Sequence, residues 1–175
     1  MRSLETTPRP TPATMRRQWV VDASPAILLA KVGHIGLLPA CADTVLIPEP
    51  VAEEIQAGPP TDPARAWLDE EGHRFVQPTG APVQTVAAWD LGRGERAVLS
   101  FAAQHSGWIA LVDDGAARRC ASALDIDVLG TLGVLVIAYH DDQLSHVRPV
   151  IQDLQHAGMH IHASLVDHVL SRIHE

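Results

Sequence analysis

The chain has 175 residues, a length that accommodates one domain of ordinary size. Hydrophobic residues make up 46% of the sequence and aromatic residues only 4%, which predicts a folded domain with an aliphatic core. The net charge of −8 excludes a protein that holds nucleic acid through bulk positive charge, because such binding needs many cationic contacts to phosphate. Any nucleic-acid chemistry therefore requires a metal ion or a local basic strip.

The two cysteines and the N-terminal segment indicate the compartment and the domain limits. Cys41 and Cys120 are too few for a disulfide framework, and we expect reduced thiols in a cytoplasmic protein. The sequence contains no apolar run near the ~18 residues that span a bilayer, and no signal peptide is visible. Residues 1–17 are rich in proline and threonine and predict a disordered tail. The folded domain is therefore expected over residues 18–175.

Short apolar runs alternate with helical patterns through this domain. Strands are expected at residues 19–21, 45–47, 75–76, 108–112 and 126–129. Helices are expected from a cap at Ser24 to Gly33, at 51–56, from Asp62 to Gly72, at 94–104, at 116–124, from Gly130 or Thr131 to Tyr139, at 144–157, and from a cap at Ser164 to the C-terminus, with a loop at 77–88. This alternation predicts a three-layer α/β/α sandwich around a central, mainly parallel sheet.

Acidic residues follow two of the best strand candidates. Asp22 ends the first, and Asp113 and Asp114 end the fourth. Because parallel strands present their carboxyl ends at one edge of a sheet, these side chains are expected at the same edge. Glu54, in the helix after the second strand, and Glu95, in the first turn of a later helix, are placed to reach that edge.

Several carboxylates at one point repel each other unless a cation neutralises them. Mg²⁺ prefers oxygen ligands and keeps coordination positions for water and phosphate, so the constellation favours phosphodiester hydrolysis. A purely structural interpretation stays open for single residues. Asp22 and Asp114 each precede a predicted helix, where an acid is commonly only an N-cap.

The chain contains, in order, the segments VVDASPAILLAKVGHIGLLP, VLIPEPVAEEI, LGRGERAVLSFA and ALVDDGAARRCASALDIDVLGTLGVL. Together they resemble the PIN-domain superfamily of metal-dependent ribonucleases, and most of all its prokaryotic VapC-type toxin relatives. The resemblance covers about residues 19–175. It implies an endoribonuclease that uses Mg²⁺ or Mn²⁺, forms homodimers and pairs with a small antitoxin.

The resemblance also implies a role for particular residues of this chain. It implies that the metal is held, and catalysis carried out, by Asp22, Glu54, Glu95 and Asp113, with Asp114 as a further candidate metal ligand. Arg118 and Thr131 are the candidate substrate-binding residues. In the wider superfamily the third acid is more often Asp, so Glu95 departs from the common pattern, and Glu53 is a weaker candidate than its neighbour.

Alternatives remain beside the nuclease hypothesis. A catalytically inactive PIN-like module for binding or regulation has the same fold. A phosphotransfer receiver places its acid pair after the first strand, whereas here the pair comes late, and an Asp-nucleophile phosphatase needs an acid where this chain has Ser24. His160 and His162, with His156 or His168, are a zinc candidate, but no cysteine and no ordered ligand spacing supports a closed site, and solvated histidines on helices are the alternative.

Overall fold

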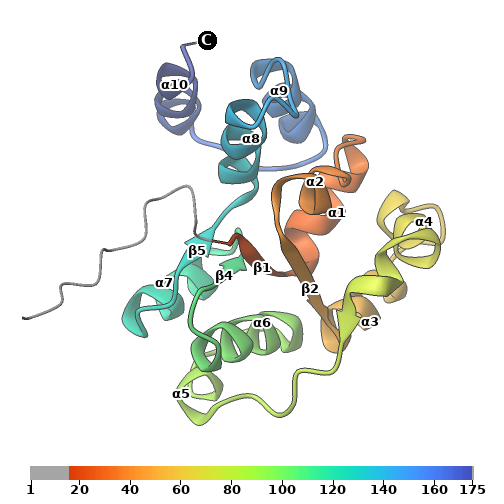
Figure 1. Cartoon of the computed structure of the whole chain (residues 1–175), viewed down its shortest axis with the longest axis vertical. Coiled ribbons are helices and arrows are strands. Elements are labelled where there is room, and N and C mark those ends of the chain that lie inside the picture. Colours follow the sequence, from red (N-terminus) through yellow and green to blue (C-terminus); the bar gives the residue numbers. More distant parts are fainter. Residues whose placement is uncertain (1–15, 175) are drawn as a thin grey trace, which may run out of the picture.

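Five short strands form one sheet in the order β3-β2-β1-β4-β5, and each neighbouring pair runs parallel (Figure 1). The computed structural model describes residues 16–174. The strands are β1 (Gln18–Val21), β2 (Thr44–Pro48), β3 (Val76–Gln77), β4 (Trp108–Leu111) and β5 (Val128–Leu129). The predicted parallel sheet is confirmed.

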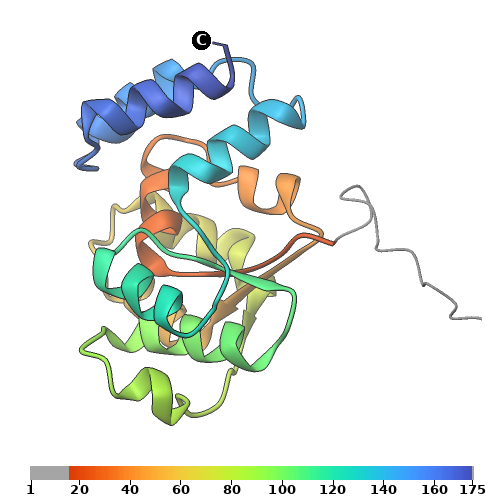
Figure 2. The same ribbon diagram turned by 90° about the vertical axis from the view of Figure 1, so that its left-hand side faces the viewer.

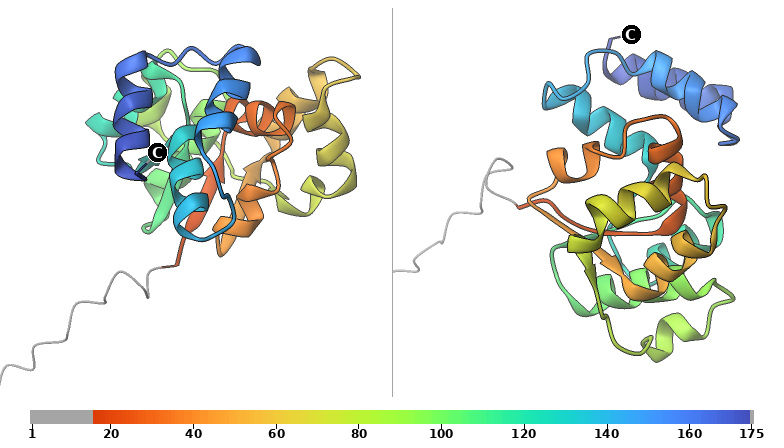
Figure 3. Two further views of the ribbon diagram at one scale, coloured as in Figure 1. Left: turned by 90° about the horizontal axis from the view of Figure 1, so that it is seen from above. Right: turned by 90° about the vertical axis from the view of Figure 1, so that its right-hand side faces the viewer.

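Helices cover both faces of this sheet. They are α1 (Ala23–Lys31), α2 (Leu37–Cys41), α3 (Glu49–Ala57), α4 (Pro63–Glu70), the 3-10 helix η2 (Gly72–Phe75), α5 (Gln84–Ala87), α6 (Arg93–Gln104), α7 (Gly115–Ala123), α8 (Thr131–His140), α9 (Arg148–His156) and α10 (Ala163–Arg172). Helices α1, α2 and α8 lie on one side, and α5, α6 and α7 lie on the other (Figure 2). Helices α9 and α10 lie beyond α8, at the end of the molecule away from α5 (Figure 3). Within residues 16–174, none of the helices combines the length and hydropathy needed to cross a bilayer.

The central strand β1 lies in the middle of the core. Trp19, Val20 and Val21 are all fully buried, as expected for a parallel strand covered on both faces. The core around them is aliphatic, as the composition predicts. Cys41 and Cys120 are buried free thiols, and burial raises the pKa of both.

The register of β1 against β4 brings the two acidic strand ends together. Val21 is paired with Leu111, and the backbone N–H of Asp22 donates to the Leu111 carbonyl at 3.1 Å. Asp22 therefore lies level with Val112, one residue before Asp113. The chain also changes direction across the sheet here, since β2 and β3 follow on one side of β1 and β4 and β5 on the other. Such switch points are where open parallel sheets bind ligands.

Several predicted element limits are wrong, for local reasons. The helix expected over 144–157 begins only at Arg148. Pro149 fits a first helical turn, but in the interior of a longer helix it would clash with the preceding turn. Ser24 and Ser164 are not the caps, because α1 begins at Ala23 and α10 at Ala163. The loop expected over 77–88 contains the short helix α5, whose Val86 is fully buried.

The tail expected over residues 1–17 lies outside the described residues except for Arg16 and Arg17. The backbone N–H of Arg17 donates to Asp43 at 2.7 Å, and its guanidinium donates to the Cys41 carbonyl at 3.3 Å. The same guanidinium forms an ion pair with Asp141. Arg17 thus ties the start of β1 to α2 and to the end of α8.

Candidate active site

Asp22 is the buried centre of the acidic site. It follows β1 directly, is only 4% exposed, and its Oδ1 atom has no hydrogen-bond partner among the described residues. Burial raises the pKa of Asp22 to about 7; the backbone amide of Ala23 opposes this rise, and the charges of Glu95, Glu54 and Asp113 add to it. Asp22 occupies the N-cap position of α1, yet its side chain makes no cap hydrogen bond within the described chain. The cap interpretation of Asp22 is therefore not supported.

Glu54 approaches Asp22 across a glycine. A Cβ atom on Gly94 of α6 would lie 2.9 Å from Glu54 Oε2 and 3.3 Å from Asp22 Oδ1. The missing side chain at this position lets α6 pack close to both carboxylates. Partial burial raises the pKa of Glu54, and the charge of Glu95 raises it further. Both carboxylates therefore border the same small space beside Gly94.

Glu95, in the first turn of α6, both caps this helix and contributes charge to the acidic cluster. Its Oε2 atom accepts a hydrogen bond of 2.9 Å from the backbone N–H of Gly92, which helps to cap the helix. Its charge also raises the pKa of both Asp22 and Glu54, which places it within the same acidic cluster. Glu53, by contrast, is exposed and forms an ion pair with Arg93.

Asp113 is held in place by the start of α8. Its Oδ1 atom accepts a 2.8 Å hydrogen bond from the backbone N–H of Thr131, and its Oδ2 atom accepts one of 2.6 Å from the Thr131 hydroxyl. Thr131 is fully buried, so this two-point contact is shielded from solvent. Both hydrogen-bond donors of Thr131 are directed at Asp113, so Thr131 is a positioning residue.

Asp114 is the N-cap residue of α7, and Arg118 lies within this helix. Oδ1 of Asp114 accepts hydrogen bonds from the backbone N–H groups of Ala116 and Ala117, at 2.8 and 3.0 Å, so this residue caps the helix. Arg118 donates to the Val112 carbonyl at 3.1 Å. The structural interpretation left open for Asp114 accounts for one of its two carboxylate oxygens.

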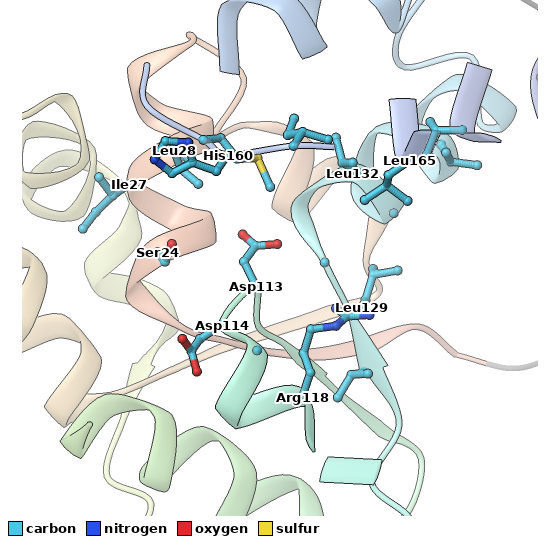
Figure 4. A pocket seen from close by; sticks show the side chains of 18 of the residues that line it. Ser24, Ile27, Leu28, Asp113, Asp114, Arg118, Leu129, Leu132, His160 and Leu165 are labelled. Atoms are coloured by element: carbon cyan, nitrogen blue, oxygen red, sulfur yellow. The ribbon is translucent and has the colours of Figure 1, made fainter. Parts of the chain in front are cut away.

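A cavity of about 1230 Å³ opens over the acidic residues, and Glu54, Glu95, Asp113 and Asp114 line it. Figure 4 shows Asp113 and Asp114 between Ser24 of α1 and Arg118 of α7, with the side chains of the C-terminal segment toward the top of the view. Asp22 is buried and is not among the residues that line this cavity. The cavity is large enough for a segment of a polymer as well as an ion.

The donor set fits a hard divalent cation. All four converging side chains are carboxylates, and one buried carboxylate oxygen lacks a partner, which is the type of atom that such an ion would satisfy. Within residues 16–174, no three His, Cys, Asp or Glu side chains are close enough together to hold one ion as they stand. The acids therefore converge on one edge without forming a closed cage. The same finding leaves the zinc candidate around His160 without a formed site.

The sequence interpretation missed two glycines that shape this site. Gly94 provides the close approach of Glu54 and Asp22, and a Cβ on Gly130 would lie 3.0 Å from Asp113 Oδ1 and 3.1 Å from Arg118 Nη1. A glycine within a helix costs stability relative to alanine, so its presence calls for a packing reason. Gly94, directly before the candidate ligand Glu95, is therefore the sequence signal that could have revealed this close contact.

The parallel sheet and the acids at its switch point define an α/β domain with an acidic site at the carboxyl edge of the sheet. A family model described as a PIN domain matches residues 18–175, and the chain belongs to the PIN-domain family. A comparison with curated proteins gives no match.

Proposed function

We propose that the protein is an endoribonuclease that hydrolyses RNA phosphodiester bonds with Mg²⁺ or Mn²⁺. The metal would be held by Asp22, Glu54, Glu95 and Asp113, with Asp114 at the margin of the site. The observation that supports this proposal most strongly is the buried Asp22 carboxylate, which has an unpartnered oxygen and is surrounded by three further acids. Bringing these charges together is costly, and a ligand cation is the simplest reason for keeping them.

A bound divalent cation lowers the pKa of a water molecule and neutralises charge that grows on the phosphate. The residues of this chain supply what surrounds that chemistry. Asp22 and Glu54 offer negative charge beside Gly94, and Thr131 fixes the orientation of both oxygens of Asp113. Arg118 lines the cavity, where its guanidinium can contact a substrate phosphate.

Cleavage of a fluorescently labelled RNA by the purified protein tests the proposal. We expect cleavage with Mg²⁺ or Mn²⁺, none with EDTA, and none from Asp22→Asn in either metal. Asp127→Asn is the matched control, because Asp127 is an exposed carboxylate outside the acidic cluster. Cleavage by Asp22→Asn at the wild-type rate would show that the mechanism is wrong.

One observation favours a second candidate, a PIN-like binding or regulatory module without catalysis. In the described part of the chain, no three candidate ligands stand at the spacing that one ion requires. Calorimetry separates the two candidates, since the nuclease proposal requires Mg²⁺ or Mn²⁺ to bind. Absence of binding up to millimolar metal would favour the regulatory module.

Membership of the PIN-domain family and the VapC-like segments support a finer proposal. The protein would be the toxin of a toxin-antitoxin pair, form a homodimer and be held inactive by a small antitoxin. Light scattering of the purified chain tests the dimer. Growth arrest on expression, absent for Asp22→Asn, tests the toxin role, and growth unaffected by an RNA-cleaving wild-type chain would contradict it.

A further inference from the structure

The cavity has a second wall that the acidic residues do not explain. Residues 157–161 line it, and so do four side chains of α10. Those four side chains are Leu165, His168, Val169 and Arg172. Their spacing of three, one and three residues places them on a single face of the helix, and that face is turned toward the cavity.

The basic and imidazole side chains of this second wall come from other elements than the carboxylates do. Arg172 and His168 come from α10, and His160 from the segment before it, whereas the acids come from α3, α6 and the end of β4. Lys31 and Arg118 also line the cavity. Lys31 lies 4.0 Å from Asp62, so part of its charge is neutralised within the protein. Arg172 and Arg118 therefore bring positive charge to this cavity in a chain whose net charge is −8, and such local charge is what an acidic protein needs for contact with phosphate.

The second wall also carries apolar side chains. Leu165 is 46% exposed, and Met159 and Leu132 line the same cavity. Unpaired bases offer flat apolar faces at regular intervals along a single strand, while its phosphates offer negative charge. The volume of about 1230 Å³ exceeds the roughly 300–1,000 Å³ of ordinary small-molecule sites, so it suits a strand segment better than one nucleotide.

We propose that α10 and residues 157–161 form a strand-binding wall for single-stranded RNA. Arg172, with His168 and His160, contacts phosphates, and Leu165 and Met159 contact bases of the strand whose scissile phosphate lies at the acids. This inference rests on the proposed ribonuclease function and adds the part of the fold that holds the substrate. An apolar peptide would account for the exposed Leu165 but not for Arg172 on the same face of α10.

Binding of RNA to Arg172→Gln tests this wall. All arms carry Asp22→Asn to prevent cleavage, and a fluorescein-labelled 12-nucleotide RNA without secondary structure is titrated with full-length protein in Mg²⁺ by anisotropy. Arg172→Gln should weaken binding by about fivefold to tenfold and lower the salt slope by about 0.7, the value for one lost phosphate contact on a single strand. Arg119→Gln is the control, because Arg119 is exposed on α7 and the described cavity lining does not include it.

Equal weakening by Arg172→Gln and Arg119→Gln would mean that only bulk charge matters, and it would overturn the wall. So would unchanged binding by Arg172→Gln, or no binding by the Asp22→Asn chain alone. A change in oligomeric state caused by Leu165→Asp, together with unchanged RNA binding, would assign the face to a second copy. Circular dichroism of each variant checks the fold.

Kinetics in the chain with Asp22 intact separate the wall from the catalytic site. Arg172→Gln should raise KM about fivefold to tenfold and leave kcat within about twofold, because the lost contact lies away from the reacting phosphate. A fall in kcat with unchanged KM would contradict the assignment. If the wild-type chain cleaves no RNA but Arg172→Gln still lowers affinity, the nuclease proposal fails and the binding wall stands.

Discussion

Replacing Asp22 with Asn is expected to stabilise the metal-free protein increasingly as the pH rises. Asp22 is buried beside Glu54, Glu95 and Asp113, and this environment raises its pKa to about 7 from an ordinary value of 3.8. The folded chain therefore keeps a proton on Asp22 that the unfolded chain releases. Between these two pKa values the folded state binds more protons, so wild-type stability must fall as the pH rises.

The magnitude follows from the two pKa values. They differ by about three pH units, and each unit corresponds to about 1.4 kcal/mol, so the complete penalty is about 4 kcal/mol above pH 7. About 1.5 kcal/mol of it is already present at pH 5, and about 2.5 kcal/mol more develops between pH 5 and pH 8. Asn carries no charge and escapes this penalty, although its buried amide adds a cost that does not depend on pH.

Urea unfolding in EDTA at pH 5 and pH 8 measures this effect. The stability of Asp22→Asn relative to the wild type should rise by about 2.5 kcal/mol between the two values, whatever the constant offset. Asp127→Asn is the control and should show no comparable change with pH. Adding Mg²⁺ at pH 8 should stabilise the wild type, because a ligand that binds only the folded state raises its stability, and should leave Asp22→Asn unchanged.

Two results would refute the reasoning. If the stability difference between Asp22→Asn and the wild type is the same at pH 5 and pH 8, Asp22 does not titrate as its burial requires. If EDTA-treated wild-type protein becomes more stable relative to Asp22→Asn at high pH, the sign is reversed, and an unrecognised partner satisfies the charge.

Three further variants test how the site is built. Gly94→Ala should lower cleavage at least tenfold, because its Cβ would lie 2.9 Å from Glu54 Oε2, which has to move, and 3.3 Å from Asp22 Oδ1. The same Cβ would lie 3.1 Å from Cγ2 of the buried Val51, so we expect the free energy of unfolding to fall by about 1 kcal/mol. Gly36→Ala, where a Cβ meets open space, is the control, and equal activity of the two variants would be the contrary result. Thr131→Val should cost about 10- to 100-fold in metal affinity or kcat and about 1 kcal/mol in stability, measured by Mg²⁺ titration and urea unfolding. Asp114→Ala should destabilise the protein by about 1 kcal/mol through the lost helix cap and leave kcat within about threefold, whereas a loss above tenfold would make Asp114 a ligand.

The acidic edge could be predicted because it depends on simple rules. A strand of Val and Leu that ends in Asp, repeated in two neighbouring parallel strands, has to present both acids at one edge. The observed pairing of Val21 with Leu111 confirms this inference for Asp22 and Asp113. Helix limits were less predictable, as Pro149 shows, because a pattern of apolar positions continues through a residue that the backbone cannot accommodate within a helix.

The contacts within the site could not be predicted from the sequence. No pattern in the sequence shows that Thr131 holds Asp113, or that Asp114 is used as a cap while Asp22, also at a helix start, is not. Each of these outcomes depends on which donor lies within hydrogen-bond distance of a given carboxylate oxygen. That is a matter of distances between elements far apart in the chain.

The sequence alone determined the parallel α/β architecture, the aliphatic core and the identity of the acids at the strand ends, because these follow from hydrophobic periodicity and from the direction of parallel strands. Only the tertiary structure decided that Gly94 lets Glu54 approach Asp22, and that α10 turns Arg172 toward the same cavity. The reason is physical: local patterns fix which face of an element is buried, whereas packing between distant elements fixes which polar groups meet.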